Sequence, residues 1–245
     1  MSTPLIWVPV RDCVFLKRLN RFVAEVLVEG RVERAHITNT GRLEELLVRG
    51  RRCKVAGING RKLRYRLVAL EDRGGYAVID TRTQSRAFEA AVERGLLCFF
   101  HGCRIAGREP RIGEGRLDYV LECNGDRVMV ETKSAVLRGP SGEAMYPDCP
   151  TKRGVRHVRE LVRLMKSGVR VAIVFIAAFP GARCFKPFRE GDPQLYDVLT
   201  NALAIGLEVK SLGIYMDNSG IVYLEKPCLD LCRDWVSEAA ERAKG

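Results

Sequence analysis

The first 80 residues consist of short apolar runs separated by turn-forming residues, and this pattern limits the fold more than any other feature of the chain. Glycine marks several of the breaks, as in Glu29-Gly30, Asn59-Gly60 and Gly74-Gly75. Short, evenly spaced runs of this kind predict β-strands, and Asn-Gly is typical of a two-residue hairpin. We expect strands at residues 5–10, 13–19, 22–29, 33–37, 51–58, 63–71 and 76–80, with one short helix at 43–48. This combination favours a small closed barrel, of which the OB-fold is the common nucleic-acid-binding form.

From about residue 83 the elements become longer and alternate between helix and strand. Ser85 is placed to cap a helix that runs through Arg94 and ends at Gly95. The pattern further predicts strands at 115–123, 127–136, 169–177 and 207–215, and helices at 151–167, 194–205 and 230–243. Such alternation indicates an α/β domain with a mixed sheet. We therefore expect two domains, covering residues 1–82 and 83–245.

The turn at Asn124-Gly125 predicts a hairpin whose register brings two acidic residues together. With a two-residue turn, Cys123 faces Asp126, Asp118 faces Glu131 and Arg116 faces Lys133. Because side chains alternate along a strand, the charged residues share one face. The opposite face is apolar and consists of Leu117, Tyr119, Leu121, Val128 and Val130.

Two carboxylates that face each other destabilise a hairpin unless a cation lies between them. Mg²⁺ or Mn²⁺ suits this position, because a hard divalent cation binds carboxylate oxygens together with waters and a phosphate. Lys133 is placed to orient an attacking water or to neutralise charge on the phosphate that is cleaved. The pattern therefore predicts a metal site at Asp118 and Glu131 with Lys133 as a catalytic residue. The alternative is a ladder of diagonal ion pairs on a solvated face, Arg116 with Glu131 and Asp118 with Lys133.

Two helices flank this hairpin in the sequence. Glu89, in the first, is either a third catalytic carboxylate or a solvated helix residue. The second, at 151–167, has a basic face that suits phosphate contacts, although a plain solvated face has the same composition. His157 on this helix is suited to contact phosphate or carry a proton, and equally to a hydrogen-bonded structural role. The residues of this helix that we expect to bind DNA are Lys152, Arg153, Arg156, His157 and Arg159.

The net charge of +11, with 41 Lys and Arg against 30 Asp and Glu, favours a polyanionic partner. Arginine supplies most of the basic residues, and its planar guanidinium pairs with phosphate and stacks on bases. General use of arginine by a thermophile would produce the same bias. The surplus is greatest in the first 80 residues, where we expect Arg51, Arg52 and Arg64 to contact DNA from the barrel.

The nine cysteines show no CxxC pair and no zinc-finger spacing, so a metal site at the thiols is not expected. An odd number of cysteines suggests mostly buried thiols. The scarcity of glutamine and the arginine bias suggest a hyperthermophile, in which intracellular disulfides occur. The cysteines nearest in sequence are Cys98 with Cys103 and Cys228 with Cys232.

The longest apolar run, from Val171 to Pro180, is about half the length that spans a bilayer. The apolar stretch at residues 4–10 lacks the basic flank and cleavage site of a signal peptide. We therefore expect a cytoplasmic protein without a membrane partner; whether it forms a homodimer is left open.

Several stretches together resemble the sugar fermentation stimulation protein A family over nearly the whole chain. They are Arg21-Phe22-Val23-Ala24-Glu25-Val26, Asn39-Thr40-Gly41, Arg116-Leu117-Asp118-Tyr119-Val120, Val130-Glu131-Thr132-Lys133-Ser134, Tyr146-Pro147-Asp148, Thr151-Lys152-Arg153-Gly154 and His157-Val158-Arg159-Glu160-Leu161. The resemblance implies an N-terminal OB-fold followed by a PD-(D/E)xK nuclease-like domain with a central mixed sheet flanked by helices.

In that nuclease superfamily the metal carboxylates correspond to Asp118 and Glu131, the lysine to Lys133, and a helical acid to Glu89. The resemblance also implies DNA binding and transcription regulation linked to sugar (maltose) metabolism. Two positions depart from the family pattern: Cys149 replaces a small residue, and Asp80 replaces an asparagine at the domain junction.

Two functions are consistent with these residues. One is a DNA-binding protein with a divalent-metal site and largely sequence-independent affinity. The other is an active Mg²⁺- or Mn²⁺-dependent DNA nuclease that hydrolyses phosphodiester bonds. An RNA-binding module is a third, because an OB-fold accepts either kind of single strand.

Overall fold

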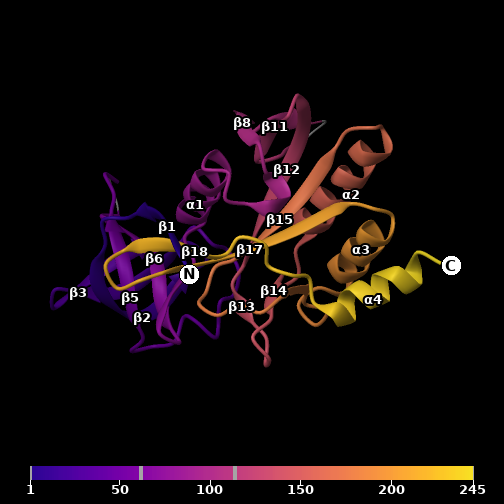
Figure 1. Ribbon diagram of the computed structural model, residues 1–245. Coiled ribbons are helices and arrows are strands. Elements are labelled where there is room, and N and C mark those ends of the chain that lie inside the picture. Colours follow the sequence, from indigo (N-terminus) through magenta and orange to yellow (C-terminus); the bar gives the residue numbers. More distant parts are fainter. Residues whose placement is uncertain (1, 61–62, 113–114, 245) are drawn as a thin grey trace.

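The computed structural model describes residues 2–60, 63–112 and 115–244 (Figure 1). The N-terminal part contains β1 (Thr3–Trp7), β2 (Arg11–Asn20), β3 (Val23–Val28), β4 (Arg31–His36), β5 (Arg52–Gly57), β6 (Tyr65–Asp72) and β7 (Gly75–Val78). The remainder contains α1 (Thr81–Glu93), β8 (Cys103–Arg108), β9 (Arg111–Ile112), β10 (Gly115–Arg116), β11 (Tyr119–Cys123), β12 (Asp126–Ala135), β13 (Leu137–Arg138), β14 (Ala144–Tyr146), α2 (Lys152–Lys166), β15 (Val171–Ala177), β16 (Phe185–Pro187), α3 (Pro193–Ala204), β17 (Glu208–Met216), β18 (Ile221–Lys226) and α4 (Arg233–Arg242).

Strands β2 to β6 close into the barrel that the sequence predicts. The strands lie in the order β4-β3-β2-β5-β6, and a parallel pairing of β4 with β6 completes the circle. All other neighbours in the barrel are antiparallel. Alternate residues of β3, namely Ala24, Val26 and Val28, point into the barrel and are buried there. This connectivity is that of an OB-type barrel.

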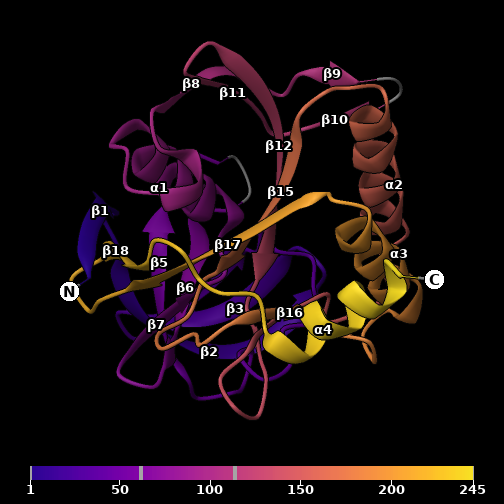
Figure 2. The same cartoon turned by 45° about the vertical axis from the view of Figure 1, so that its right-hand side comes forward.

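The second half is built on a mixed sheet in the order β17-β15-β12-β11-β8. Strands β12, β15 and β17 are parallel, whereas β11 and β8 are antiparallel to their neighbours. Helix α1 lies on one side of this sheet, and α2, α3 and α4 lie on the other (Figure 2). Covered on both sides, β15 is buried at every residue, as its continuous apolar sequence predicts.

Hydrogen-bonded strands join the two halves of the chain. The first strand, β1, pairs with β18 near the C-terminal end, and β7 pairs with β17 at Tyr76 and Met216. The buried ammonium of Lys54 in the barrel donates hydrogen bonds to the carbonyl and the side-chain oxygen of Asn218, at 2.7 and 2.9 Å. The barrel therefore packs against the second sheet as part of one continuous hydrophobic core.

One local expectation for the barrel is wrong. Residues 43–48 form turns rather than a helix. Leu43 has a positive φ of 55°, and its amide donates to Asp148 in the second half, so a tertiary contact replaces helix formation. The hairpin predicted at Asn59-Gly60 is confirmed, because β5 and β6 pair antiparallel with Gly57 opposite Tyr65; residues 61–62 of the expected connection lie outside the described residues.

The first helix begins four residues earlier than Ser85 because Asp80 caps it. The Asp80 carboxylate accepts hydrogen bonds from the amide and hydroxyl of Thr83. It also accepts one from Thr38 and lies 3.0 Å from Arg66 of the barrel. Asp80 is fully buried, so in this chain it is a structural residue at the junction of the two halves.

Several short or edge strands lie outside the predicted pattern. β8 is an edge strand, β18 lies between β17 and β1, and β13, β14 and β16 form a small separate sheet. Each is brief or interrupted, as by Gly107 in β8, so its local alternation is weak. The predicted helices at 151–167, 194–205 and 230–243 are confirmed to within three residues at each end.

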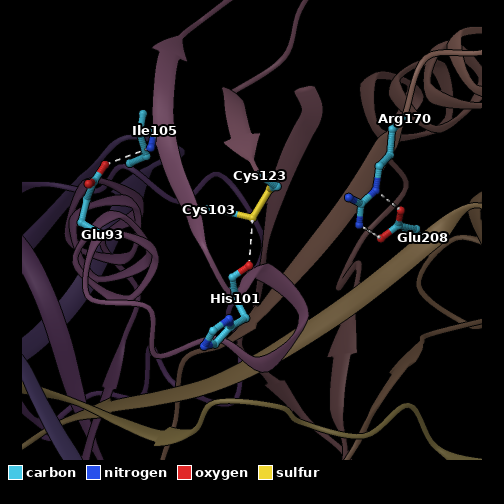
Figure 3. The surroundings of a disulfide bond; sticks show 7 residues. All are labelled: Glu93, His101, Cys103, Ile105, Cys123, Arg170 and Glu208. Atoms are coloured by element: carbon cyan, nitrogen blue, oxygen red, sulfur yellow. Dashed lines mark hydrogen bonds and ion pairs between the residues drawn. A yellow bond between two sulfur atoms is a disulfide. The ribbon is translucent and has the colours of Figure 1, made fainter. Parts of the chain in front are cut away.

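Eight cysteines form four disulfides: Cys13–Cys53, Cys98–Cys228, Cys103–Cys123 and Cys184–Cys232. The cysteines nearest in sequence, Cys98 with Cys103 and Cys228 with Cys232, are not bonded to each other. Figure 3 shows Cys103–Cys123, which connects neighbouring strands β8 and β11 close to an Arg170–Glu208 ion pair. In the chain-entropy model each disulfide stabilises the fold by about 3–5 kcal/mol at these loop lengths. Cys149 remains a free thiol.

Within the described residues, no helix has the length and apolar character needed to cross a bilayer.

A thiol titration checks the disulfides. The protein denatured without reductant should titrate with one thiol, that of Cys149, and after reduction with nine. Cleavage with a protease under non-reducing conditions should yield the four linked peptide pairs named above. More than one reactive thiol in the unreduced, denatured chain would contradict these pairings.

Candidate nucleic-acid and metal site

The hairpin of β11 and β12 has the register that the Asn124-Gly125 turn predicts. Cys123 pairs with Asp126 and Tyr119 pairs with Val130, which places Asp118 opposite Glu131. The predicted apolar face, Leu117, Tyr119, Leu121, Val128 and Val130, is buried throughout. Glu131, on the other face of β12, is also buried and contacts His157 of α2, so this acidic residue is not solvated.

Asp118 lies just before β11 and is held by the neighbouring strand. Its Oδ2 accepts hydrogen bonds from the backbone amide of Thr132 at 2.7 Å and from the Thr132 hydroxyl at 2.6 Å. Burial raises the pKa of Asp118, and the negative charge of Glu131 raises it further, against the opposing hydrogen bonds of Thr132. The two carboxylates are therefore close enough to repel each other.

Glu131 is 2% exposed and lies between two basic groups. Its Oε1 contacts the ammonium of Lys133 and lies 2.5 Å from Nδ1 of His157 on α2. Burial alone would raise the pKa of Glu131, but its partners His157 and Lys133 lower it. Glu131 in turn raises the pKa of Lys133 against the effect of burial, so the lysine is held as a cation.

One oxygen of Glu131 has no partner. Oε2 is buried and makes no hydrogen bond in the structure. An unpaired carboxylate oxygen in a protein interior costs free energy on the order of 1–3 kcal/mol or more. Such an oxygen, beside a second carboxylate, is the arrangement that a bound cation would satisfy.

Arg116 does not face Lys133, contrary to the expected register. It pairs with Arg111 in the separate ribbon of β9 and β10, and its guanidinium bonds Glu109 at 3.0 Å. The hairpin ladder ends at Tyr119, and the chain diverges before Arg116. The alternative of diagonal ion pairs on a solvated face is therefore not what the structure shows: Lys133 pairs with Glu131 on its own strand.

Glu89 points from α1 toward the same hairpin but has other partners. Arg108 of β8 donates two hydrogen bonds to it, at 3.1 and 2.9 Å, and the hydroxyl of Tyr119 donates a third. The hydrogen bonds from Arg108 lower the pKa of Glu89. Its role as a third catalytic carboxylate stays a prediction.

The basic residues of α2 divide between two sides of the helix. Arg153 faces His157, whose Nε2 accepts from the guanidinium at 3.3 Å, so both belong to the surroundings of Glu131. Lys152, Arg156 and Arg159 instead line a groove beside α3 that also includes Gln194. No carboxylate in the described part of the chain pairs with Lys152, Arg156 or Arg159.

The basic residues of the barrel are farther apart. Arg51 lines a depression with Arg73 and Arg138, close to the strand that follows Lys133. Arg52 lies 3.7 Å from Glu71, and Arg64 lies 3.2 Å from Glu33. The structure thus brings Arg153 and His157 to the carboxylates, and leaves Arg52 and Arg64 in surface ion pairs on the barrel.

A cleft of about 320 Å³ lies between the barrel and the second half, next to these residues. Arg21, Asn39 and Gly41 line it from the barrel, and Tyr146 and Arg153 line it from the other side. We assigned no separate role to Asn39, Tyr146 and Asp148 from the sequence, although each lies in a stretch that resembles the family. Spacing cannot reveal such a cleft, because its two walls are far apart in the chain, 95 residues between Asn39 and Ser134.

Asp148 and Ser134 hold the cleft together. Asp148 accepts a hydrogen bond from the amide of Leu43, and a side chain at Gly41 would collide with it, which explains the glycine there. Ser134, directly after Lys133, accepts from Asn39 at 3.2 Å. The barrel loop is therefore fixed to the strand that carries the lysine.

The donor set fits a cation that needs few protein ligands. In the regions that the structure describes, no three His, Cys, Asp or Glu side chains converge as a complete ligand set. Mg²⁺ keeps several waters and often binds through only one or two carboxylates and a substrate phosphate. Asp118 and Glu131 are suited to hold such an ion.

Fold and site together define a class: an OB-type barrel joined to an α/β domain that carries a carboxylate–lysine hairpin. Family models match both parts, described as the "SfsA N-terminal OB domain" over residues 16–79 and the "Sugar fermentation stimulation protein RE domain" over residues 82–220. The chain belongs to the sugar fermentation stimulation protein family, and the predicted fold class is confirmed.

Two relatives from archaea cover most of the chain, and both are described as a sugar fermentation stimulation protein homolog. The one from Pyrococcus furiosus is 52% identical over 88% of this chain and 94% of its own length. The one from Archaeoglobus fulgidus is 42% identical over 89% and 94%, respectively. The solved structure of Pyrococcus furiosus SfsA in complex with Ca²⁺ has a TM-score of 0.90 and 48% identity, covering 94% of this chain and 99% of that one.

Replacing Asp118 with asparagine should stabilise the protein in EDTA at neutral pH. The pKa of Asp118 is higher in the folded than in the unfolded state, so its ionised form opposes folding above the folded pKa. Asparagine keeps an oxygen for Thr132 and removes the charge. The thermal midpoint should rise at pH 7, and the gain should vanish at a pH low enough to protonate Asp118. A lower midpoint at pH 7 would contradict this account.

Proposed function

We propose that this chain is a DNA-binding protein that holds a divalent cation, Mg²⁺ or Mn²⁺, at Asp118 and Glu131. The observation that carries the proposal is the carboxylate pair of buried Glu131 and half-buried Asp118, with an unpartnered oxygen on Glu131, beside the ammonium of Lys133. That Pyrococcus furiosus SfsA was solved in complex with Ca²⁺ supports it, because Ca²⁺ also binds through oxygen ligands.

DNA binding is supported by the charge and by its placement. Arg153 lines the cleft near the carboxylates, and Lys152, Arg156 and Arg159 lie without acidic partners in the described residues along α2. Unpaired basic residues on one helix suit contacts to phosphates, which carry no sequence information by themselves. We therefore propose affinity that depends little on DNA sequence and strongly on salt.

The salt dependence of binding tests this interface. Each phosphate contact that is lost reduces the slope of log K against log[salt] by about 0.9 for duplex DNA or about 0.7 for a single strand. Arg153→Ala and Arg159→Ala should each weaken binding and lower the slope by roughly one contact, whereas Arg31→Ala, at the start of β4 in the barrel, should not. Fluorescence anisotropy over a range of salt concentrations measures this. Unchanged slopes in both α2 variants would remove the helix from the interface.

A second function, hydrolysis of DNA by this site, is favoured by the position of Lys133. Its ammonium contacts Glu131 and lies near His157. A divalent cation bound at the carboxylates would polarise a phosphodiester and lower the pKa of a bound water. Lys133 is placed to stabilise negative charge on the phosphate, and Thr132 to keep Asp118 oriented.

A gel assay separates binding alone from binding with hydrolysis. Single- and double-stranded DNA are incubated with the protein in EDTA, Mg²⁺ or Mn²⁺, next to Asp118→Ala and Lys133→Ala. If the site is catalytic, cleavage requires the metal and falls at least about 100-fold in both variants. Tight binding without cleavage under any ion would contradict the nuclease function and leave the DNA-binding proposal.

A further inference from the structure

The cleft between the barrel and the second half is lined by residues from both parts of the chain. Its walls come from the turn after β2, with Arg21, and from the segment that leads into α2, with Lys152 and Arg153. Three basic side chains and the carboxylate of Asp148 thus line one small cavity. No acidic partner in the described parts of the chain pairs with Arg21 or Lys152.

The cleft also leads to the carboxylates. Ser134 lines it and directly follows Lys133 on β12. Arg153 lines it too and bonds His157, which contacts Glu131. A polyanion that enters the cleft therefore comes close to the carboxylate pair.

An exposed aromatic residue of the barrel is the chain neighbour of one residue that lines this cleft. Phe22 follows Arg21 in the chain and is 51% exposed. An exposed phenylalanine beside basic residues is the combination with which proteins bind unpaired bases, because the ring stacks on a base while the cations bind the backbone. The base pairs of a duplex are already stacked and offer no free face to such a ring.

The volume of the cleft sets an upper limit on its occupant. About 320 Å³ is at the lower end of the range for small-molecule sites, roughly 300–1,000 Å³, which is room for one nucleotide but not for the width of a duplex. The barrel wall cannot move away freely. Leu43 is bonded to Asp148, and Asn39 is bonded to Ser134.

We infer that this cleft binds an unpaired nucleotide of a single-stranded nucleic acid, and so delivers a single strand to Asp118, Glu131 and Lys133. The inference rests on the proposed nucleic-acid binding and names the substrate class for the same site. Phe22 stacks on a base, and Arg21, Lys152 and Arg153 contact the backbone phosphates on either side.

Cys149 provides a probe inside the cleft. It lines the cavity, it is half-buried, and it is the one cysteine outside the four disulfides. Burial and the neighbouring Asp148 raise the pKa of its thiol, so alkylation is followed at mildly alkaline pH. The native protein in EDTA is treated with a maleimide, alone or after saturation with a short oligothymidylate or with a blunt duplex of equal length. Anisotropy confirms saturation in each case.

The bound single strand should slow alkylation of Cys149 several-fold, and the bound duplex should not. If both ligands bind and neither protects the thiol, the nucleic acid lies elsewhere and the inference is wrong. Equal protection by the duplex would also overturn it, because selection of an unpaired strand would be lost. Failure of both ligands to bind would instead contradict the proposed function itself.

Two substitutions test the same inference without the thiol. Phe22→Ala and Arg21→Ala should each lower the affinity for the oligothymidylate at least about fivefold and that for the duplex much less. Arg31→Ala is the matched control, because the turn before Arg31 lies at the opposite end of β3. Equal losses on both nucleic acids, or no loss for either variant, would contradict a single-strand site at this cleft.

Discussion

The register of β11 against β12 places the buried carboxylate of Glu131 opposite the half-buried carboxylate of Asp118, and the rest of the site depends on this placement. A one-residue shift would turn Asp118 and Glu131 to opposite faces. The repulsion between them is offset by the partners that the fold provides. Thr132 donates to Asp118, while Lys133 and His157 bind one oxygen of Glu131. The other oxygen of Glu131 remains unpaired, which leaves the site incomplete without a cation.

Helix α2 connects this hairpin to the outer surface. His157, on its second turn, reaches Glu131, and Arg153, one turn earlier, reaches both His157 and the cleft. A residue at i and one at i+4 share a helix face, so the same face carries the contact with the carboxylate and the cation that borders the cleft. Charge on the surface is thereby linked to the buried acids through a single turn of helix.

The junction of barrel and sheet uses two other acids, the buried Asp80 and the half-buried Asp148. Asp80 caps α1 and lies against Arg66 of the barrel, and Asp148 binds the amide of Leu43. Together with the pairing of β1 with β18, these contacts set the walls of the cleft. Asp80 is fully buried and not placed to contact a ligand.

Much of the fold and part of the candidate site could be predicted from the local sequence pattern. Asn124-Gly125 determined the hairpin, and the apolar stripe of 151–167 determined α2, because both depend on neighbours in sequence. The predictions failed where contacts between residues distant in the sequence decide the local structure. Leu43 makes a turn because Asp148 takes its amide, Arg116 leaves the ladder for Glu109, and each disulfide joins cysteines at least 20 positions apart. The contact of His157 with Glu131 and the cleft likewise depend on tertiary packing.

The central claim is that Asp118 and Glu131 together hold a divalent cation, and anomalous diffraction from crystals soaked in Mn²⁺ tests it most directly. The account predicts a Mn²⁺ peak bonded to one oxygen of each carboxylate, with Oε2 of Glu131 as a ligand. The peak should disappear in Asp118→Asn crystals treated in the same way. An ion bound elsewhere in the chain, with none between these two carboxylates, would contradict it.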